Sequence, residues 1–290
     1  MGKNYLLKIF AGVLVGFMVS CNNSGSDDFE PSAGNGGNNG NGTPPPARVL
    51  EEITFNNVVQ EKYIVNSGKL VTGMFKDGNT STSYTGTVTY NGDKISKIMF
   101  LGNVAGSVSY DFTISEDSKG NMYNATCKAV APTAANSYIS DYTFTYDTTG
   151  KLTKILEKKK YGGTYAYTNF VLIDFTYIGN NIFKGDCTRG VMNGAGDPDM
   201  STAKKTMYSF QNYDSKISPF STLPKSFFMA WSLVRPDTFY RISPNNPTSV
   251  YVAPPAPATA TSTPLDYLYD NQNYPVSNKD QKLKYTYRVL

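Results

Sequence analysis

One short pattern recurs along this chain: a tyrosine, a polar turn rich in Gly, Asn and Asp, and then an aliphatic residue that often follows a lysine. The clear copies occupy residues 63–70, 90–98, 146–155 and 177–183, and weaker copies occupy residues 213–217 and 269–276. Polar turns of this composition between apolar runs are typical of β-hairpins. Two gaps between successive tyrosines are about twice as long as the others, so we expect degenerate hairpins at residues 114–122 and 242–250.

The segments that flank these turns alternate apolar and polar residues, which predicts half-buried strands. In residues 84–90, Tyr84, Val88 and Tyr90 fall on one face and three threonines on the other. Residues 142–146 and 283–289 repeat the alternation. The predicted fold of residues 48–290 is therefore all-β: an antiparallel hairpin-repeat meander that forms a curved sheet with one short packed helix. The sequence leaves open whether the two edges of the sheet meet.

The predicted helix is the main exception to the strand pattern. Thr222 is suited to cap it and Pro236 to end it. We expect the helix to pack on the sheet, so that its aromatic residues belong to the core and not to a cofactor site. Residues 253–264, rich in Pro, Ala and Thr, are predicted to form an exposed, extended loop. The apolar residues at helical spacing are Leu223, Phe227, Trp231 and Val234.

Residues 1–20 have the layout of an export signal. Lys3 and Lys8 precede an apolar run that is shorter than the roughly 20 residues a membrane span needs. Ser20 and Cys21 at its end resemble the lipobox of bacterial lipoproteins. The resemblance implies that Cys21 becomes the acylated (palmitate-bearing) N-terminus and holds the mature chain on outer-membrane lipid without a transmembrane span. The alternative is an ordinary cleaved signal in which Cys21 is incidental.

A short acidic patch follows the cysteine. It resembles the surface-export signal of lipoproteins in Bacteroidota, which implies an outer-membrane anchor that faces the cell exterior; the alternative is a solvated acidic linker. Residues 21–47, rich in Gly, Asn and Pro, are predicted to be a flexible tether. The patch consists of Ser26, Asp27, Asp28, Phe29 and Glu30.

Composition excludes several functions. The chain has no histidine, which excludes Ser-His-Asp and Cys-His nucleophile systems and imidazole-ligated metal sites. The formal net charge is +4, and Lys3 and Lys8 supply half of it, so the remainder lacks the basic surface that nucleic-acid binding requires. Cys127 and Cys187 are too few for a thiolate zinc site. They either form one disulfide or remain separate buried thiols. We expect no cofactor and no metal.

Three polar groups have two interpretations each. Paired carboxylates would suit a glycosidase, but the predicted domain has few glutamates, and most aspartates stand where turns favour them. Asp197 and Asp199 are calcium-ligand types but are interpreted as a solvated turn. Residues 158–160, three lysines, are interpreted as protection of a sheet edge rather than as a docking patch.

Tyrosines are the remaining binding candidates, since a rigid ring provides contact area at a small entropic cost. The tyrosines of the repeated pattern recur at one position of each hairpin, as a structural role requires. The candidates for binding are those outside the repeats: Tyr161, Tyr165, Tyr167 and Tyr251.

The hairpin units, with Tyr-Asp, a turn and Gly-Lys-Leu at residues 146–152, resemble the tyrosine-aspartate repeats of the Rhs family. They also resemble Bacteroidota surface lipoproteins of unknown function that carry similar hairpins. We therefore predict a non-catalytic, lipid-anchored cell-surface protein with a binding or envelope-structural role, whose partner is a glycan or a surface protein. The alternatives are a carboxylate-dependent polysaccharide-degrading surface enzyme and an accessory subunit of an outer-membrane complex.

Overall fold

The structure is a computed structural model that describes residues 47–290 apart from 77–81, 119 and 164–165. Contacts divide the chain into Met1–Glu30 and Pro31–Leu290, and all described residues belong to the second unit. The predicted signal, Cys21, the acidic patch at 26–30 and almost all of the tether lie outside the described residues. Among the residues that are described, no helix has the length and apolar character needed to cross a membrane.

The described unit is built mainly from 17 strands in one antiparallel sheet, as predicted from the alternating pattern. The strands are β1 (Arg48–Phe55), β2 (Val58–Asn66), β3 (Lys69–Lys76), β4 (Ser83–Asn91), β5 (Lys94–Gly102), β6 (Ser109–Glu116), β7 (Met122–Val130), β8 (Tyr138–Tyr146), β9 (Leu152–Tyr161), β10 (Asn169–Ile178), β11 (Asn181–Val191), β12 (Lys204–Gln211), β13 (Ser249–Ala253), β14 (Thr261–Pro264), β15 (Leu268–Tyr269), β16 (Pro275–Ser277) and β17 (Leu283–Val289).

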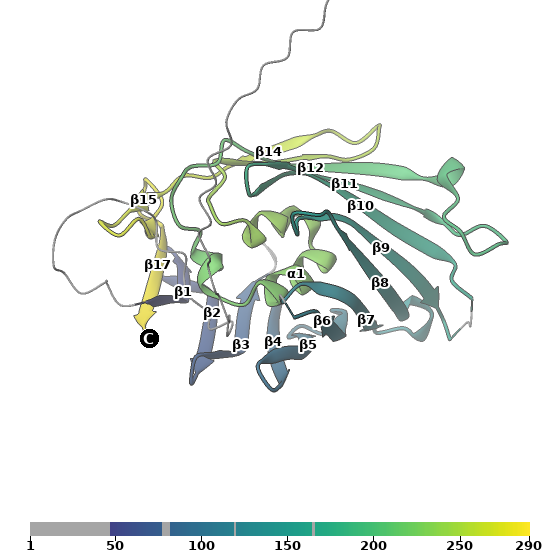
Figure 1. Cartoon of the computed structure of the whole chain (residues 1–290), viewed down its shortest axis with the longest axis horizontal. Helices are drawn as coiled ribbons and strands as arrows, with labels where there is room; N and C mark the ends of the chain where they lie inside the picture. Colours follow the sequence, from purple (N-terminus) through teal and green to yellow (C-terminus); the bar gives the residue numbers. More distant parts are fainter. Residues whose placement is uncertain (1–46, 77–81, 119, 164–165) are drawn as a thin grey trace, which may run out of the picture. The chain divides into compact units, whose positions relative to one another are not determined.

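The strands follow one another as a meander. From β1 to β14 each strand pairs with its successor. At the other side of β1 the sheet continues through β17, β16 and β15. No ladder joins β14 to β15 within the described residues, so the sheet is open. Figure 1 shows it curving around α1 (Lys225–Val234), with β2 to β5 on one side and β11 to β14 on the other.

The repeated tyrosines connect neighbouring hairpins. The hydroxyl of Tyr90 donates to the Leu70 carbonyl at 3.1 Å, and that of Tyr146 donates to the Met122 carbonyl at 2.9 Å. A β-bulge shifts the register immediately before each of these tyrosines. The bulge and the bond recur together, so the tyrosine pattern is a structural device that aligns successive turns.

Lysines of these turns form hydrogen bonds to a later hairpin, whereas the tyrosines bond to an earlier one. The amine of Lys69 donates to the carbonyl of Gly92 at 2.8 Å, and the amine of Lys151 donates to that of Gly179 at 2.7 Å. Lys94 makes the equivalent bond to the Asp117 carbonyl at 2.7 Å. The turns after β2, β4, β6 and β10 are therefore held by a tyrosine or a lysine of a neighbouring hairpin, which accounts for the recurrence of these residues.

The concave face of the sheet is filled by residues 218–246, which we call the plug. It contains η3 (Pro219–Thr222), α1 and η4 (Pro236–Ile242). Phe227 and Trp231 of α1 are buried, and the Phe227 ring lies 5.5 Å from that of Phe100 on β5. The predicted helix that packs on the sheet through its aromatic residues is confirmed.

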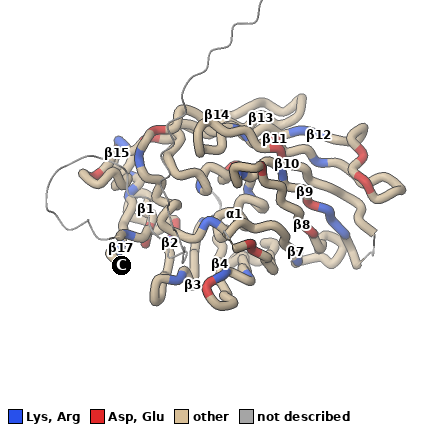
Figure 2. Tube along the Cα trace, in the orientation of Figure 1, with Lys and Arg blue, Asp and Glu red and all other residues tan. Residues whose placement is uncertain are grey.

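The outer face of the sheet carries charge pairs between strands. Lys97 and Asp111 lie 2.9 Å apart across β5 and β6, and Lys205 of β12 lies 2.9 Å from Asp186 of β11. Figure 2 shows basic and acidic positions interspersed along the strands. A face of this composition is solvated, whereas the opposite face is packed against the plug.

Several details of the prediction are wrong. The degenerate hairpin at 114–122 exists as β6 and β7, but residues 242–250 run from the last residue of η4 into β13 and form no hairpin, and 213–217 is a loop. Thr222 is not the helix cap, because Pro224 takes that position and the Thr222 hydroxyl accepts the backbone N–H of Leu50 at 2.9 Å. Residues 253–264 are not all loop, since β14 pairs with β13.

The interpretation of residues 158–160 as an edge is also wrong. They lie on β9, which pairs with both β8 and β10. Lys159 points inward and lies 3.2 Å from Glu157, whereas Lys160 points outward, 3.5 Å from Asp141. The three lysines therefore divide between the two faces of a central strand.

Candidate functional site

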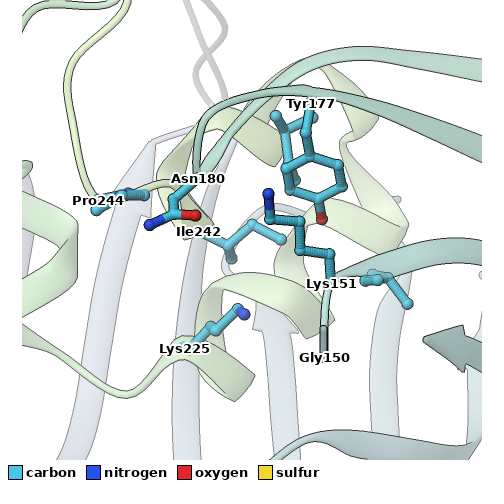
Figure 3. A pocket seen from close by; sticks show the side chains of 9 residues that line it. Gly150, Lys151, Tyr177, Asn180, Lys225, Ile242 and Pro244 are labelled. Carbon is cyan, nitrogen blue, oxygen red and sulfur yellow. The ribbon is translucent and has the colours of Figure 1, made fainter. Parts of the chain in front are cut away.

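The candidate site is a pocket of about 230 Å³ where the turns of two hairpins meet the plug (Figure 3). The β8–β9 turn, the β10–β11 turn, the first residue of α1 and the end of η4 each contribute part of its wall. Four of its residues are Lys, Asn or Tyr, and none is Asp or Glu. The lining residues are Gly150, Lys151, Leu152, Tyr177, Asn180, Ile182, Lys225, Ile242 and Pro244.

Lys225 is the most distinctive group in this pocket. It begins α1, because Pro224 fixes the preceding backbone and the apolar spacing of the helix starts directly after it. Within the described part of the chain its amine has no hydrogen bond and no ion pair. The side chain is exposed at the surface, but the atoms packed around its amine partly desolvate it and lower its pKa. An amine in this condition gains more from an anionic partner than an amine in open water does.

Lys151 reaches the same pocket from the β8–β9 turn. One of its three N–H groups is used by the Gly179 carbonyl, and the amine lies 5.7 Å from the centre of the Tyr177 ring. Burial raises the pKa of Tyr177 to about 12, so its hydroxyl stays protonated near neutral pH. The amide of Asn180 is exposed and makes no hydrogen bond to other described residues. The polar side chains of the pocket are thus two ammonium groups, which only donate, and an amide and a hydroxyl, which can donate or accept.

The buried carboxylates lie elsewhere and are already paired. One oxygen of Glu157 accepts from the hydroxyls of Ser140 at 2.6 Å and Tyr142 at 2.7 Å, and lies 3.2 Å from the Lys159 amine. Glu61 accepts two bonds from Arg241 of the plug. These acids fix the sheet to itself and to the plug.

A second cavity, of about 90 Å³, lies beside Glu157. It is lined by Tyr110, Tyr138, Lys159 and Arg189, and the plug closes it through Leu233 and Pro236. Burial raises the pKa of Tyr110 and Tyr138 well above the usual range, so both hydroxyls remain neutral donors. At this volume the cavity suits a few ordered waters better than an organic ligand.

The two cysteines are free and buried, on β7 and β11. Of the two alternatives left open by the sequence, the structure shows separate thiols. Burial raises the pKa of Cys187 to about 11 and that of Cys127 further, so both stay protonated and unreactive at neutral pH.

The tyrosines predicted for binding are not gathered into one site. Tyr161 packs against Tyr138 with ring centres 5.3 Å apart, and Tyr251 is half-buried on β13. The Tyr167 hydroxyl donates to Asp141 at 2.6 Å on the outer face, and Tyr165 lies outside the described residues.

The acidic loop at residues 197–199 forms local hydrogen bonds. Asp199 accepts the backbone N–H of Ser201 at 3.0 Å and so caps a short 3₁₀ turn, while the Asp197 N–H donates to Asn193 at 2.9 Å. No group of three or more potential metal-ligating side chains occurs among the residues that the structure describes. The interpretation as a solvated turn agrees with this geometry.

Comparison with known proteins gives a likeness in structure only. No family model and no curated protein matches the chain. A porin-like protein from Bacteroides vulgatus ATCC 8482 is 15% identical with a TM-score of 0.45, and the match covers 83% of this chain and 98% of that one. A porin-like protein from Bacteroides uniformis ATCC 8492 is 16% identical with a TM-score of 0.42, over 84% and 97% of the two chains.

Proposed function

We propose that this chain is a non-catalytic, lipid-anchored protein of the bacterial cell surface whose curved sheet presents a binding pocket. The observation that carries the binding role is the pocket at Lys151 and Lys225, whose lining combines two ammonium groups with neutral polar and apolar groups and includes no carboxylate. Carboxylate-based hydrolysis of a polysaccharide requires two acids beside the substrate. Glu157 and Glu61 are instead engaged within the packed interior.

The anchor rests on the N-terminal sequence. The apolar run of residues 9–20, the Ser20–Cys21 pair and the acids at 26–30 support lipidation and display at the outer face. The charged outer face of the sheet fits a domain that is held in water by a tether rather than one immersed in lipid.

Display is tested on intact cells that produce the full chain. We expect a protease added outside to remove the domain, and we expect the triple variant Asp27→Ala, Asp28→Ala and Glu30→Ala to be protected while it remains membrane-bound. Digestion of the parent chain only after the outer membrane is opened would contradict surface display.

The binding role is tested separately from the location. The full chain is presented to a glycan array and used for pull-down from surface extracts, and we expect a retained ligand without turnover. Degradation of a polysaccharide that is abolished by Glu157→Gln or Glu61→Gln would support the enzyme alternative instead. Recovery of one stoichiometric outer-membrane partner after mild crosslinking would support the role of accessory subunit.

A further inference from the structure

We infer that the pocket between the β8–β9 turn, the β10–β11 turn and the plug binds a small organic carboxylate, with the carboxylate at the Lys225 amine and a short apolar body against Ile182 and Ile242. This assignment of the ligand class rests on the proposed function, in which the same pocket is a binding site.

The lining of the pocket favours an anion. A neighbouring acid, Asp147 of the β8–β9 turn, interacts electrostatically with Lys151 and Tyr177 but does not line the pocket. Lys225 and Lys151 supply two ammonium groups and no lining residue is acidic. Some lysines of the domain have acidic partners, such as Lys97 with Asp111 at 2.9 Å, whereas Lys151 donates to a backbone carbonyl. Lys225 has none among the described residues, so a bound carboxylate would provide the counter-charge that the fold itself does not supply.

The donor side chains belong to different elements, so several of them can bond to one carboxylate of the ligand. Figure 3 shows Lys225 extending from α1 on one side of the pocket, with Lys151 and Asn180 reaching in from the two hairpin turns. Lys151 keeps two N–H groups after its bond to Gly179. The carboxylate oxygens can therefore be shared between donors on the sheet and a donor on the plug.

The helix adds to this preference. Lys225 is the first residue of a ten-residue helix that has no acidic side chain in its first turn. The partial positive charge at a helix N-terminus favours an anion nearby. This effect only reinforces the amines, which are the main attraction.

The remaining wall limits the body of the ligand. Leu152, Ile182, Ile242 and Pro244 are apolar, and Figure 3 shows the Tyr177 ring beside the Lys151 side chain. A cavity of roughly 150 Å³ holds a benzene ring. The pocket, at about 230 Å³, has room for a ring or a short chain together with its carboxylate.

The test is calorimetric titration of the full chain in a non-ionic detergent with benzoate, and with benzamide as the neutral analogue of the same shape. We expect benzoate to bind at least about tenfold more tightly than benzamide, since a carboxylate accepts stronger hydrogen bonds from ammonium groups than a neutral amide oxygen does. Lys225→Met should remove that difference, Lys225→Arg should keep most of it, and Lys204→Met, an exposed lysine on β12, should leave it unchanged. Equal affinity for both ligands, or a benzoate affinity that survives Lys225→Met, would overturn the inference.

A second measurement does not depend on a variant. Lysines of the full chain are methylated with formaldehyde and a borohydride, with and without benzoate, and the peptides are compared by mass spectrometry. Benzoate should slow modification of Lys225 and Lys151 but not of Lys204, and equal rates at all three would contradict the site. Loss of surface display with intact benzoate binding would refute only the location, whereas display without binding would refute only the ligand.

Discussion

Arg241 of the plug and Glu61 of β2 form a two-point ion pair, with nitrogen–oxygen distances of 2.7 and 3.1 Å. The two side chains are only 12% and 11% exposed. The Tyr63 hydroxyl donates to the same carboxylate at 2.5 Å, and the guanidinium lies 4.4 Å from the centre of the Phe220 ring. Burial opposes the charged form of Arg241, but the charge and hydrogen bond of Glu61 together with Tyr240 and Tyr63 outweigh it and keep the pKa of Arg241 well above its usual range. The pair is thus a charged connection between plug and sheet.

Removing one member of this pair should be costly. Arg241→Met leaves the Glu61 carboxylate buried without its counter-charge, and we expect a loss of about 3–5 kcal/mol in the free energy of unfolding, measured by urea denaturation. Arg235→Met removes an arginine from a half-exposed pair at the start of η4 and should cost about 1 kcal/mol, less than Arg241→Met. The double variant Glu61→Gln/Arg241→Met should recover part of the loss, and equal effects of the two arginine substitutions would contradict the assignment.

The tyrosines that connect hairpins should contribute through their hydroxyls. Tyr146→Phe keeps the ring but removes the bond to the Met122 carbonyl, so we expect a destabilisation of about 1 kcal/mol by the same measurement. Tyr123→Phe, at a position 52% exposed, serves as the control and should have no effect. If both variants unfold together with the parent chain, the hydroxyl contributes nothing to the alignment of the turns.

Close packing between the sheet and α1 depends on glycine at one position of β3. A Cβ at Gly73 would lie 2.6 Å from the Phe227 ring, which is fully buried and has no room to withdraw. We expect Gly73→Ala to cost about 1–3 kcal/mol. The matched control is Gly185→Ala, whose Cβ would meet Phe175 at 3.4 Å. If the double variant Gly73→Ala/Phe227→Leu recovers part of the lost stability, the strain lies at the Phe227 ring. If it recovers none, the loss does not come from a clash with this ring.

Glu116 stands where the other hairpins have tyrosine, and it accepts a hydrogen bond from Ser226 of the plug. Burial raises its pKa, more than the Ser226 bond lowers it. A carboxyl whose pKa is raised by folding stabilises the fold fully below its unfolded value of about 4.3 and loses this contribution as the pH rises through the folded pKa.

Stability measured across that pH range tests this effect. The parent chain should therefore lose stability relative to Glu116→Gln as the pH rises from about 4 to 7. Asp93→Asn provides the opposite case, because the hydrogen bond from Lys69 lowers the pKa of Asp93. The stabilisation by the Asp93 carboxylate is fully present above its unfolded pKa and is lost as the pH falls through its folded pKa. Parallel pH profiles for the parent chain and Glu116→Gln would contradict the raised pKa.

Local chemistry explains why much of the fold was predictable. The alternation in residues 283–289 and the turn at 146–152 depend on neighbours in sequence, and both were correctly assigned. The turn at Gly120 was found although Glu116 replaces the tyrosine, because turn composition alone indicates it. The same reasoning failed at residues 242–250, where Asn246 bonds to Asp214 instead of forming a hairpin turn. That contact joins positions far apart in sequence, and no local pattern reveals it.

The pocket could not be predicted for the same reason. Lys151 belongs to a repeat and Lys225 to a helix, and no spacing connects them until the sheet curves around the plug. The one available signal was the position of Lys225 beside Pro224, at the start of a helix with no acid in its first turn. β14 was missed because Pro, Ala and Thr indicate a loop, whereas an edge strand that pairs on one side only tolerates such residues.

The most direct test of the proposed function is mass spectrometry of the N-terminal peptide from the membrane-bound protein. We predict that the mature chain begins at Cys21 and carries fatty acyl groups, and that Cys21→Ala abolishes both the modification and membrane retention. An unmodified N-terminus on protein that is released into the medium would contradict it.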